Sequence, residues 1–141
     1  MATRAMISIA KREEGVSFSE IPERTIVDIY HHWDGYPEGV GVTLASYLED
    51  MEIVNGLGRD DIKVANGLGC LAAQLVQHFK DGPGNIYLEA INGEPGDSWE
   101  EYIYTLYPKP GEPTYISIYD VDARECIFVG TYADLQTKYD D

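Results

Sequence analysis

Cysteine and positive charge are both scarce in this chain. Its 141 residues include two cysteines, Cys70 and Cys126, which lie far apart and outside any CxxC pair. Neither a disulfide framework nor a zinc ribbon is indicated, and two isolated thiols fit a reducing interior. We therefore expect a cytoplasmic protein.

Long apolar runs are missing as well. No segment reaches the ~18 apolar residues of a membrane span, and the opening MATRAMISIA has no apolar region of signal-peptide length. The 25 acidic residues outnumber the 10 Lys and Arg, for a formal charge of −15. This charge repels nucleic acid and anionic membranes, so we expect neither as a direct partner. The same charge attracts a basic partner, or serves only to keep the protein dissolved.

Catalytic signatures are also lacking. The chain has no GxSxG, HExxH or GxxxxGK[ST] motif, and neither cysteine has a histidine nearby in sequence. Acidic pairs such as Asp60 with Asp61 arise by chance in so acidic a chain and are expected on the solvated surface. We predict a protein that is not an enzyme and needs no cofactor.

What is present is a clear change of hydrophobic period along the chain. Alternation at both ends predicts six strands, and three- and four-residue spacing between them predicts two helices, at 40–55 and 61–80. A short helix closes the chain, with Thr131 or Asp134 near its start. We predict one domain, 1–141, of the α+β class, with a mainly antiparallel sheet and the two central helices packed on one face. The expected strands lie within 3–10, 24–33, 85–92, 99–107, 114–122 and 125–132, the last four as a meander.

The apolar phases of these elements predict the core. Its expected members are Ile7, Ile9, Val27, Ile29, Leu44, Leu48, Leu71, Leu75, Ile116 and Phe128.

The stretch YHHWDGYPEGVG, residues 30–41, concentrates the unusual residues of the chain. His31 and His32 are adjacent in a predicted strand, where successive side chains point to opposite faces, so the two cannot readily share one metal ion. His78 is the third histidine of the chain, and no Cys/His cluster accompanies it. We predict no metal site.

The same stretch predicts a structural turn from strand to helix. Gly35 allows a positive φ, Pro37 suits the start of a helix, and Asp34 can accept backbone amides. Trp33 and Pro37 are expected to be mainly structural. Replacing a buried Trp33 by alanine would then cost about 3–5 kcal/mol.

The segment TRAMISI followed by IYHHWDGYPEGVG resembles a family of small bacteriophage proteins that carry an HWDGYP-type motif after a second strand, here residues 32–37. The size, helix placement and Tyr-rich sheet are also similar to the Thoeris anti-defence sponge proteins of phages. Those proteins bind and sequester a cyclic ADP-ribose signal without cleaving it. The resemblance implies a viral anti-defence protein in the host cytosol.

Two functions follow as hypotheses. The first is sequestration of a nucleotide immune signal, with aromatic rings stacking on bases and arginines meeting phosphate. Its expected ligand-binding residues are Arg4, Arg24, Tyr36, Tyr102 and Tyr104, with Arg59 and Arg124 as further cations. The alternative is an acidic mimic of nucleic acid that inhibits a host defence complex such as a CRISPR effector. The expected partner is thus a small nucleotide or a host defence protein. The sequence is also compatible with a homo-oligomer.

Overall fold

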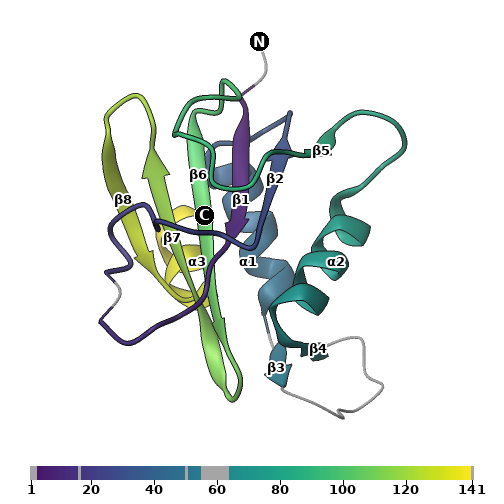
Figure 1. Ribbon diagram of the computed structural model, residues 1–141, viewed down its shortest axis with the longest axis vertical. Helices are drawn as coiled ribbons and strands as arrows, with labels where there is room; N and C mark the ends of the chain where they lie inside the picture. Colours follow the sequence, from purple (N-terminus) through teal and green to yellow (C-terminus); the bar gives the residue numbers. More distant parts are fainter. Residues whose placement is uncertain (1–2, 16, 50, 55–63, 141) are drawn as a thin grey trace.

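A six-stranded, mostly antiparallel sheet lies at the centre of the protein (Figure 1). The computed structural model describes residues 3–15, 17–49, 51–54 and 64–140. The strands lie in the order β5-β2-β1-β6-β7-β8, and each neighbouring pair is antiparallel except β1 and β6, which run parallel. Their bounds are β1 Ala5–Ile9, β2 Val27–His31, β5 Ile86–Leu88, β6 Tyr102–Lys109, β7 Glu112–Asp120 and β8 Glu125–Gly130.

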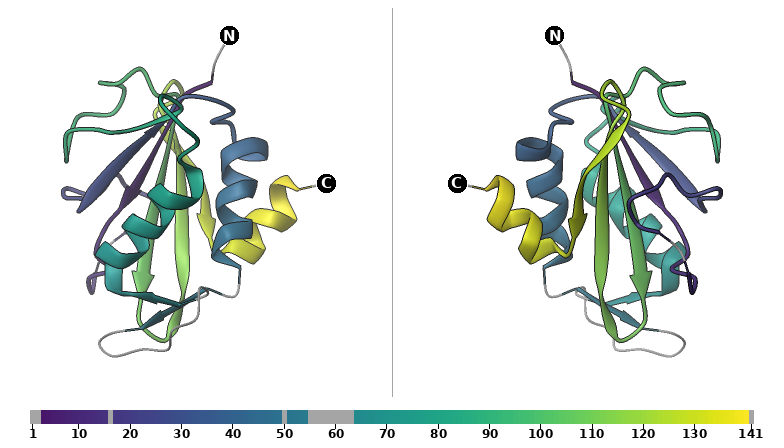
Figure 2. Two further views of the ribbon diagram at one scale, coloured as in Figure 1. Left: turned by 90° about the vertical axis from the view of Figure 1, so that its right-hand side faces the viewer. Right: turned by 90° about the vertical axis from the view of Figure 1, so that its left-hand side faces the viewer.

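Three helices join the core on one side of this sheet: α1 (Val42–Leu48), α2 (Gly67–Phe79) and α3 (Tyr132–Tyr139). Figure 2 shows α1 and α3 stacked outward from that face, and Figure 1 shows α2 beside the β2–β5 edge. The predicted α+β class is therefore confirmed, with the short closing helix α3 packed against α1. None of the helices in the described part of the chain is long and apolar enough to cross a membrane.

The predicted core is confirmed as one cluster between the sheet and the helices. Nine of its ten expected residues are buried there, and Val27 is half-buried against them. Strand alternation explains the pattern, because every second residue of β1 and β6 points toward the helices. Leu135 adds the contribution of α3, whose first turn is closed by Asp134 accepting the backbone N–H of Thr131 at 3.0 Å.

Both predicted helices are shorter than their periodicity indicates. The first ends at Leu48, and Glu52–Val54 instead forms strand β3. The second begins at Gly67, and Val64–Asn66 forms strand β4, which pairs with β3 in parallel. Ile53 and Ala65 are fully buried in this small sheet, so tertiary packing outweighs the helical period there. Residues 61–63 of the second predicted helix lie outside the described residues.

The expected meander is wrong for its first strand. β6, β7 and β8 follow one another as predicted, but β5 lies at the opposite edge of the sheet, beside β2. It is only three residues long because the chain leaves the sheet at Glu89, whose N–H still reaches the carbonyl of Asp28 at 3.1 Å. The residues that follow cover the face of the sheet opposite the helices.

The YHHWDGYPEGVG stretch does join β2 to a helix. Pro37 begins a five-residue π-helical turn, Pro37–Gly41, that continues directly into α1. The carbonyl of Asp34 accepts the N–H of Val40 at 2.8 Å. The side chain of Asp34 accepts the hydroxyl of Tyr36 at 3.3 Å, in place of the backbone amide that the motif predicts.

Gly35 is required for a different reason from the one its sequence context indicates. The positive φ in this turn belongs to Asp34, at 53°. Gly35 is buried against β1, where a Cβ would stand 2.8 Å from the Cβ of Ala5 and from the backbone carbon of Arg4. Its N–H donates to the carbonyl of Thr3 at 2.9 Å, and its own carbonyl accepts the hydroxyl of Tyr104 at 2.5 Å.

Trp33 departs from the expected buried position. Its side chain is 53% exposed, and its ring meets the edge of the His32 ring at a centroid distance of 4.5 Å. The loss of a half-exposed ring removes less apolar burial than the loss of a core residue. The cost of replacing Trp33 by alanine is therefore lower than the 3–5 kcal/mol typical of a buried aromatic.

Gly35→Ala should destabilise the protein by about 1–3 kcal/mol, since a methyl group forced into a closed contact shifts the backbone. Chemical denaturation of purified variants measures the change. The matched control is Gly69→Ala in α2, where a Cβ would meet nothing within 4 Å in the described structure. That change should stabilise by about 0.4–1 kcal/mol. Equal stabilities for the two variants would contradict the close approach at Gly35.

Candidate functional site

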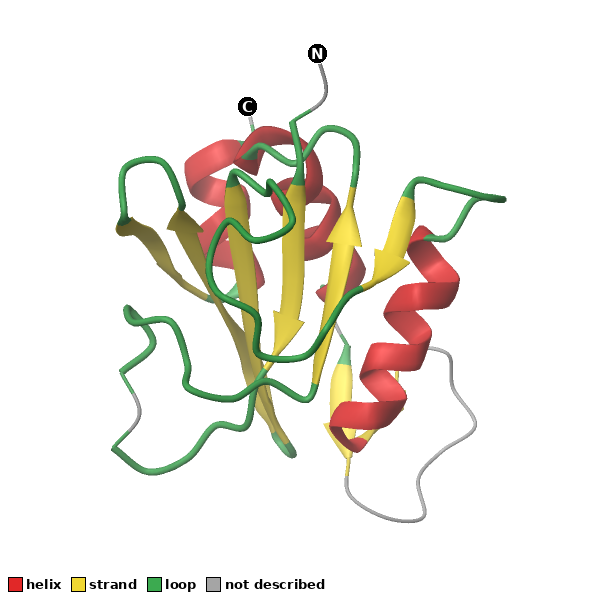
Figure 3. Cartoon of the chain, turned by 45° about the horizontal axis from the view of Figure 1, so that its top comes forward, coloured by secondary structure: helices red, strands yellow, loops and turns green. Residues whose placement is uncertain are grey.

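The face of the sheet opposite the helices carries the candidate site. Two long connections cross this face, as Figure 3 shows: one includes the described residues 10–15 and 17–26, and the other is 89–101. The first is held by Phe18, whose ring packs on Tyr107 and Tyr115 at centroid distances of 4.6 and 5.3 Å. A small second core of Met6, Tyr30 and Ile103 lies beneath them.

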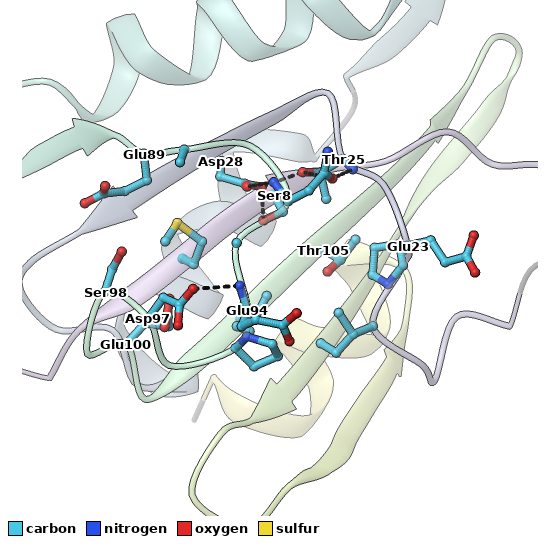
Figure 4. A pocket seen from close by; sticks show the side chains of 18 residues that line it. Ser8, Glu23, Thr25, Asp28, Glu89, Glu94, Asp97, Ser98, Glu100 and Thr105 are labelled. Atoms are coloured by element: carbon cyan, nitrogen blue, oxygen red, sulfur yellow. Dashed lines mark hydrogen bonds between the residues drawn. The ribbon is translucent and has the colours of Figure 1, made fainter.

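A cavity of about 270 Å³ lies between this face and the two connections (Figure 4). Its walls carry six carboxylates and four hydroxyls, and the described residues that line it include no Lys, Arg or His. Two of the carboxylates are buried, and the others are half-buried or exposed at the rim. The carboxylates are Glu23, Asp28, Glu89, Glu94, Asp97 and Glu100, and the hydroxyls are Ser8, Thr25, Ser98 and Thr105.

Asp28 holds the pocket together. It lies in β2, is 6% exposed, and its Oδ1 accepts the hydroxyls of Ser8 at 2.7 Å and Thr25 at 2.8 Å. Its Oδ2 accepts the N–H of Asn92 at 3.0 Å. These three contacts join β1, β2 and both covering connections, so the carboxylate of Asp28 is satisfied by the protein itself.

Glu100, the second buried carboxylate, is less completely hydrogen-bonded than Asp28. It is 4% exposed, and its Oε1 has no hydrogen-bond partner among the described residues. Burial raises the pKa of Glu100, the Asp97 carboxylate adds to this, and backbone N–H groups at Gly96 and Ser98 offset it in part. Figure 4 shows Glu100, Asp97 and Ser98 together at one end of the pocket. Glu100 is thus the pocket's unsatisfied acceptor.

The remaining walls are partly apolar. Met6, Ile21 and Ile103 line the cavity together with the hydroxyls. Asp97 lies within the covering connection 89–101, where its Oδ2 accepts the N–H of Glu94 at 2.9 Å. An apolar wall and an unpaired carboxylate suit a ligand with an aliphatic part and a positive charge, and the acidic lining opposes an anion.

A second feature of the same face is a row of aromatic rings along β2 and β5. Tyr30 lies between Tyr87, at a centroid distance of 5.9 Å, and His32, at 5.8 Å, and Trp33 extends the row. The hydroxyl of Tyr30 is 2.8 Å from Nδ1 of His32. Burial raises the pKa of Tyr30, and the guanidinium of Arg4 beside it partly offsets that rise. Tyr87 and Trp33 are each about half exposed.

The predicted ligand-binding residues do not converge on one place. Tyr104 is fully buried on the helix side of β6, so it is a core residue, and Tyr102 packs half-buried on the same side. Tyr36 is exposed in the turn after β2, and Arg24 is exposed in the connection that covers the pocket. Of these five residues, Arg4 lies at the aromatic row, beside the buried ring of Tyr30. Of the further cations, Arg124 lies exposed at the β7–β8 turn, and Arg59 lies outside the described residues.

The two adjacent histidines lie on opposite faces, as the strand pleat predicts. His31 faces the helices, with its ring edge-on to Phe79 at 5.4 Å, whereas His32 joins the aromatic row. Burial lowers the pKa of His31, so its neutral form is favoured. Among the described residues, no group of three His, Cys, Asp or Glu is placed to hold a metal ion.

Sequence patterns could have located Asp28 but not Glu100. Asp28 interrupts an apolar strand between Val27 and Ile29, which signals an inward or shared polar position. Glu100 adjoins Glu101, and acidic pairs of this kind are expected on the solvated surface. In the structure, Asp97 and Glu100 line the pocket and Glu101 does not.

Glu100→Gln should stabilise the protein at neutral pH, because it removes a buried carboxylate whose pKa is raised. The folded protein holds the Glu100 proton above the ordinary value of 4.5, so wild-type stability falls as pH rises through the raised pKa. The advantage of the variant should therefore shrink as pH falls toward 4.5. Thermal unfolding across pH measures it, with Glu101→Gln as the control of equal charge change. A destabilised Glu100→Gln at neutral pH would contradict the unsatisfied state of Glu100.

No protein-family model, no curated protein and no solved structure matches the chain. What supports a function is therefore the chemistry of the acidic pocket and of the aromatic row. The two differ in kind, since one favours positive charge and the other favours stacking on flat rings.

Proposed function

We propose that the protein acts without turnover, by stoichiometric binding of a positively charged partner through the acidic pocket and its rim. The observation that carries this proposal is the pocket lining, which combines six carboxylates with no cation among its described residues. A partner that brings positive charge relieves the repulsion between these groups. A nucleotide phosphate would increase it.

The net charge of the whole chain also favours a basic partner. The net charge of −15 attracts basic surfaces over the range of a Debye length, about 8 Å at physiological ionic strength. Glu23, Glu94 and Asp97 are exposed around the pocket and are therefore available to a partner. Complementary charge of this kind speeds encounter and selects among partners.

The resemblance to phage anti-defence proteins gives this proposal a biological setting. A basic partner in the host cytosol would be a defence protein whose nucleic-acid channel accepts the acidic surface. Of the two hypotheses, the acidic inhibitor of a defence complex is thus better supported by the pocket than the nucleotide sponge. In this proposal the carboxylates of the rim imitate the row of phosphates along a nucleic-acid strand.

Neutralising the rim should weaken binding of a basic probe. The variant Glu23→Gln/Glu89→Gln/Glu94→Gln is titrated with an oligolysine peptide by calorimetry, at low and at physiological ionic strength. We expect a loss of about 0.2–1 kcal/mol for each exposed carboxylate and a steep salt dependence in the wild type.

The matched control is Glu13→Gln/Glu14→Gln/Glu125→Gln, which has the same net charge and changes residues outside the pocket. Equal losses in the two variants would show that only net charge matters and would refute the rim as the binding surface. Gel-shift assays with purified nucleic-acid-binding defence effectors then test inhibition. Substoichiometric protein that consumes a substrate would overturn the claim of binding without turnover.

The aromatic row supports sequestration of a nucleotide as a second candidate function. Tyr87 and Trp33 present half-exposed rings at its two ends, and Arg4 stands beside Tyr30 as the cation that phosphate would need. Stacking on a base requires only such flat, accessible faces. Of the ligand-binding residues that the sequence predicts, this candidate keeps Arg4, and the aromatic row replaces the others.

Trp33→Ala and Tyr87→Ala should each weaken nucleotide binding by about 1–3 kcal/mol if a base stacks on the row. The protein is mixed with a panel of cyclic nucleotides that includes cyclic ADP-ribose, separated, and heated to release unchanged ligand. Tyr132→Ala, a half-buried tyrosine on α3, is the control. Release of no nucleotide from the wild type would remove this candidate and leave the first untouched.

A further inference from the structure

We propose that the acidic pocket is a specific site for a primary alkylammonium group, with the ammonium against Glu100 and the alkyl chain along Met6 and Ile103. This inference deepens the proposed function and rests on it in one respect, that the partner brings positive charge. It names the group that enters the pocket. That group is the end of a lysine side chain or of a free aliphatic amine.

One oxygen of the buried Glu100 carboxylate lacks a hydrogen-bond donor. A buried carboxylate oxygen without a donor costs free energy, and Glu100 Oε1 is buried with no donor among the described residues. Asp28, at the other buried position, shows what a satisfied carboxylate in this pocket looks like, with three donors from the protein. The structure supplies donors to both oxygens of Asp28 and leaves Oε1 of Glu100 without a donor among the described residues.

The kind of cation follows from the geometry of the donors and acceptors. A divalent metal needs several oxygen ligands around one point, and among the described residues no group of three His, Cys, Asp or Glu side chains is placed to hold one. A guanidinium binds best as a two-pronged donor to both oxygens of a carboxylate. Backbone N–H groups at Gly96 and Ser98 already serve Glu100, so one free oxygen remains. A single ammonium N–H matches it.

The other ammonium hydrogens also find acceptors at this end of the pocket. Asp97 and Ser98 line the cavity beside Glu100 (Figure 4). Oδ2 of Asp97 accepts the N–H of Glu94, and carboxylate oxygens can each accept more than one hydrogen bond. An ammonium carries three donors, which this cluster of oxygens can accept together.

The aliphatic part of the ligand fits the apolar strip of the pocket. Met6 of β1 and Ile103 of β6 are neighbours across the parallel pair, and Ile21 packs against them from the covering connection. A cavity of about 270 Å³ has room for an extended aliphatic chain. Long cationic side chains bury their methylene stems on apolar surface in this way.

The test uses the whole protein with methyl-labelled methionine and nuclear magnetic resonance. Met6 lines the pocket, whereas Met51 packs against the helix-side core and serves as the internal reference. The probes are 1,5-diaminopentane, Nα-acetyl-lysine methylamide and the uncharged 1-pentanol. We expect both amines, and not the alcohol, to shift the Met6 methyl signal and leave Met51 unchanged.

Glu100→Gln should weaken amine binding about tenfold or more, since it removes the charged acceptor. Glu101→Gln lies one residue away outside the pocket, carries the same charge change, and should leave the affinity within about twofold. The two amines separate the sources. Tighter binding of the lysine derivative indicates a partner's side chain, and tighter binding of the diamine indicates a free amine.

Equal effects of Glu100→Gln and Glu101→Gln, or no shift of Met6 with either amine, would overturn the site. That outcome leaves the proposed function standing if oligolysine still binds through the rim. The reverse result is that the amines bind in the pocket while the rim substitutions leave the affinity for oligolysine no weaker than the control substitutions do. That result would refute the proposed function and keep the pocket as an amine site.

Discussion

The hydrogen-bonded position of β1 between β2 and β6 is the constraint on which the rest of the structure depends. All five residues of the strand are buried, and the strand pairs antiparallel on one side and parallel on the other. Alternation sends Ile7 and Ile9 into the helix-side core, while Met6 and Ser8 form part of the pocket wall. A shift of one residue in this pairing would exchange the two faces and destroy both the core and the pocket.

Burial has opposite energetic effects on the two faces of the sheet. On the helix side, burial is apolar and supplies the free energy that holds the fold. On the other side, two carboxylates are buried under irregular connections, at a cost in desolvation. Asp28 recovers that cost through three donors and thereby fixes the connections over the sheet. Glu100 recovers it only in part, because its Oε1 has no donor among the described residues, and this difference between two acidic residues is the basis of the proposed ammonium site.

The HWDGYP stretch belongs to the scaffold more than to the site. Gly35 allows the turn to touch β1, and the buried hydroxyl of Tyr104 holds the turn to β6. The turn thereby sets where α1 begins and how it crosses the sheet. Trp33 and Tyr36 are exposed, and Trp33 ends the aromatic row.

The sequence by itself determined the α+β class and nearly all of the core, because strand and helix periods are local patterns that burial of apolar side chains enforces. It also determined that His31 and His32 face apart. The lengths of the helices were decided by tertiary structure, since Ile53 and Ala65 gain more from pairing as strands than from extending a helix. Tertiary structure also decided the position of β5, because this strand pairs with β2, which is distant in sequence. The pattern around Asp28 could indicate a buried polar position, but the pocket itself could not be predicted, because whether an acidic residue such as Glu100 is solvated or buried depends on connections that fold over it from remote parts of the chain.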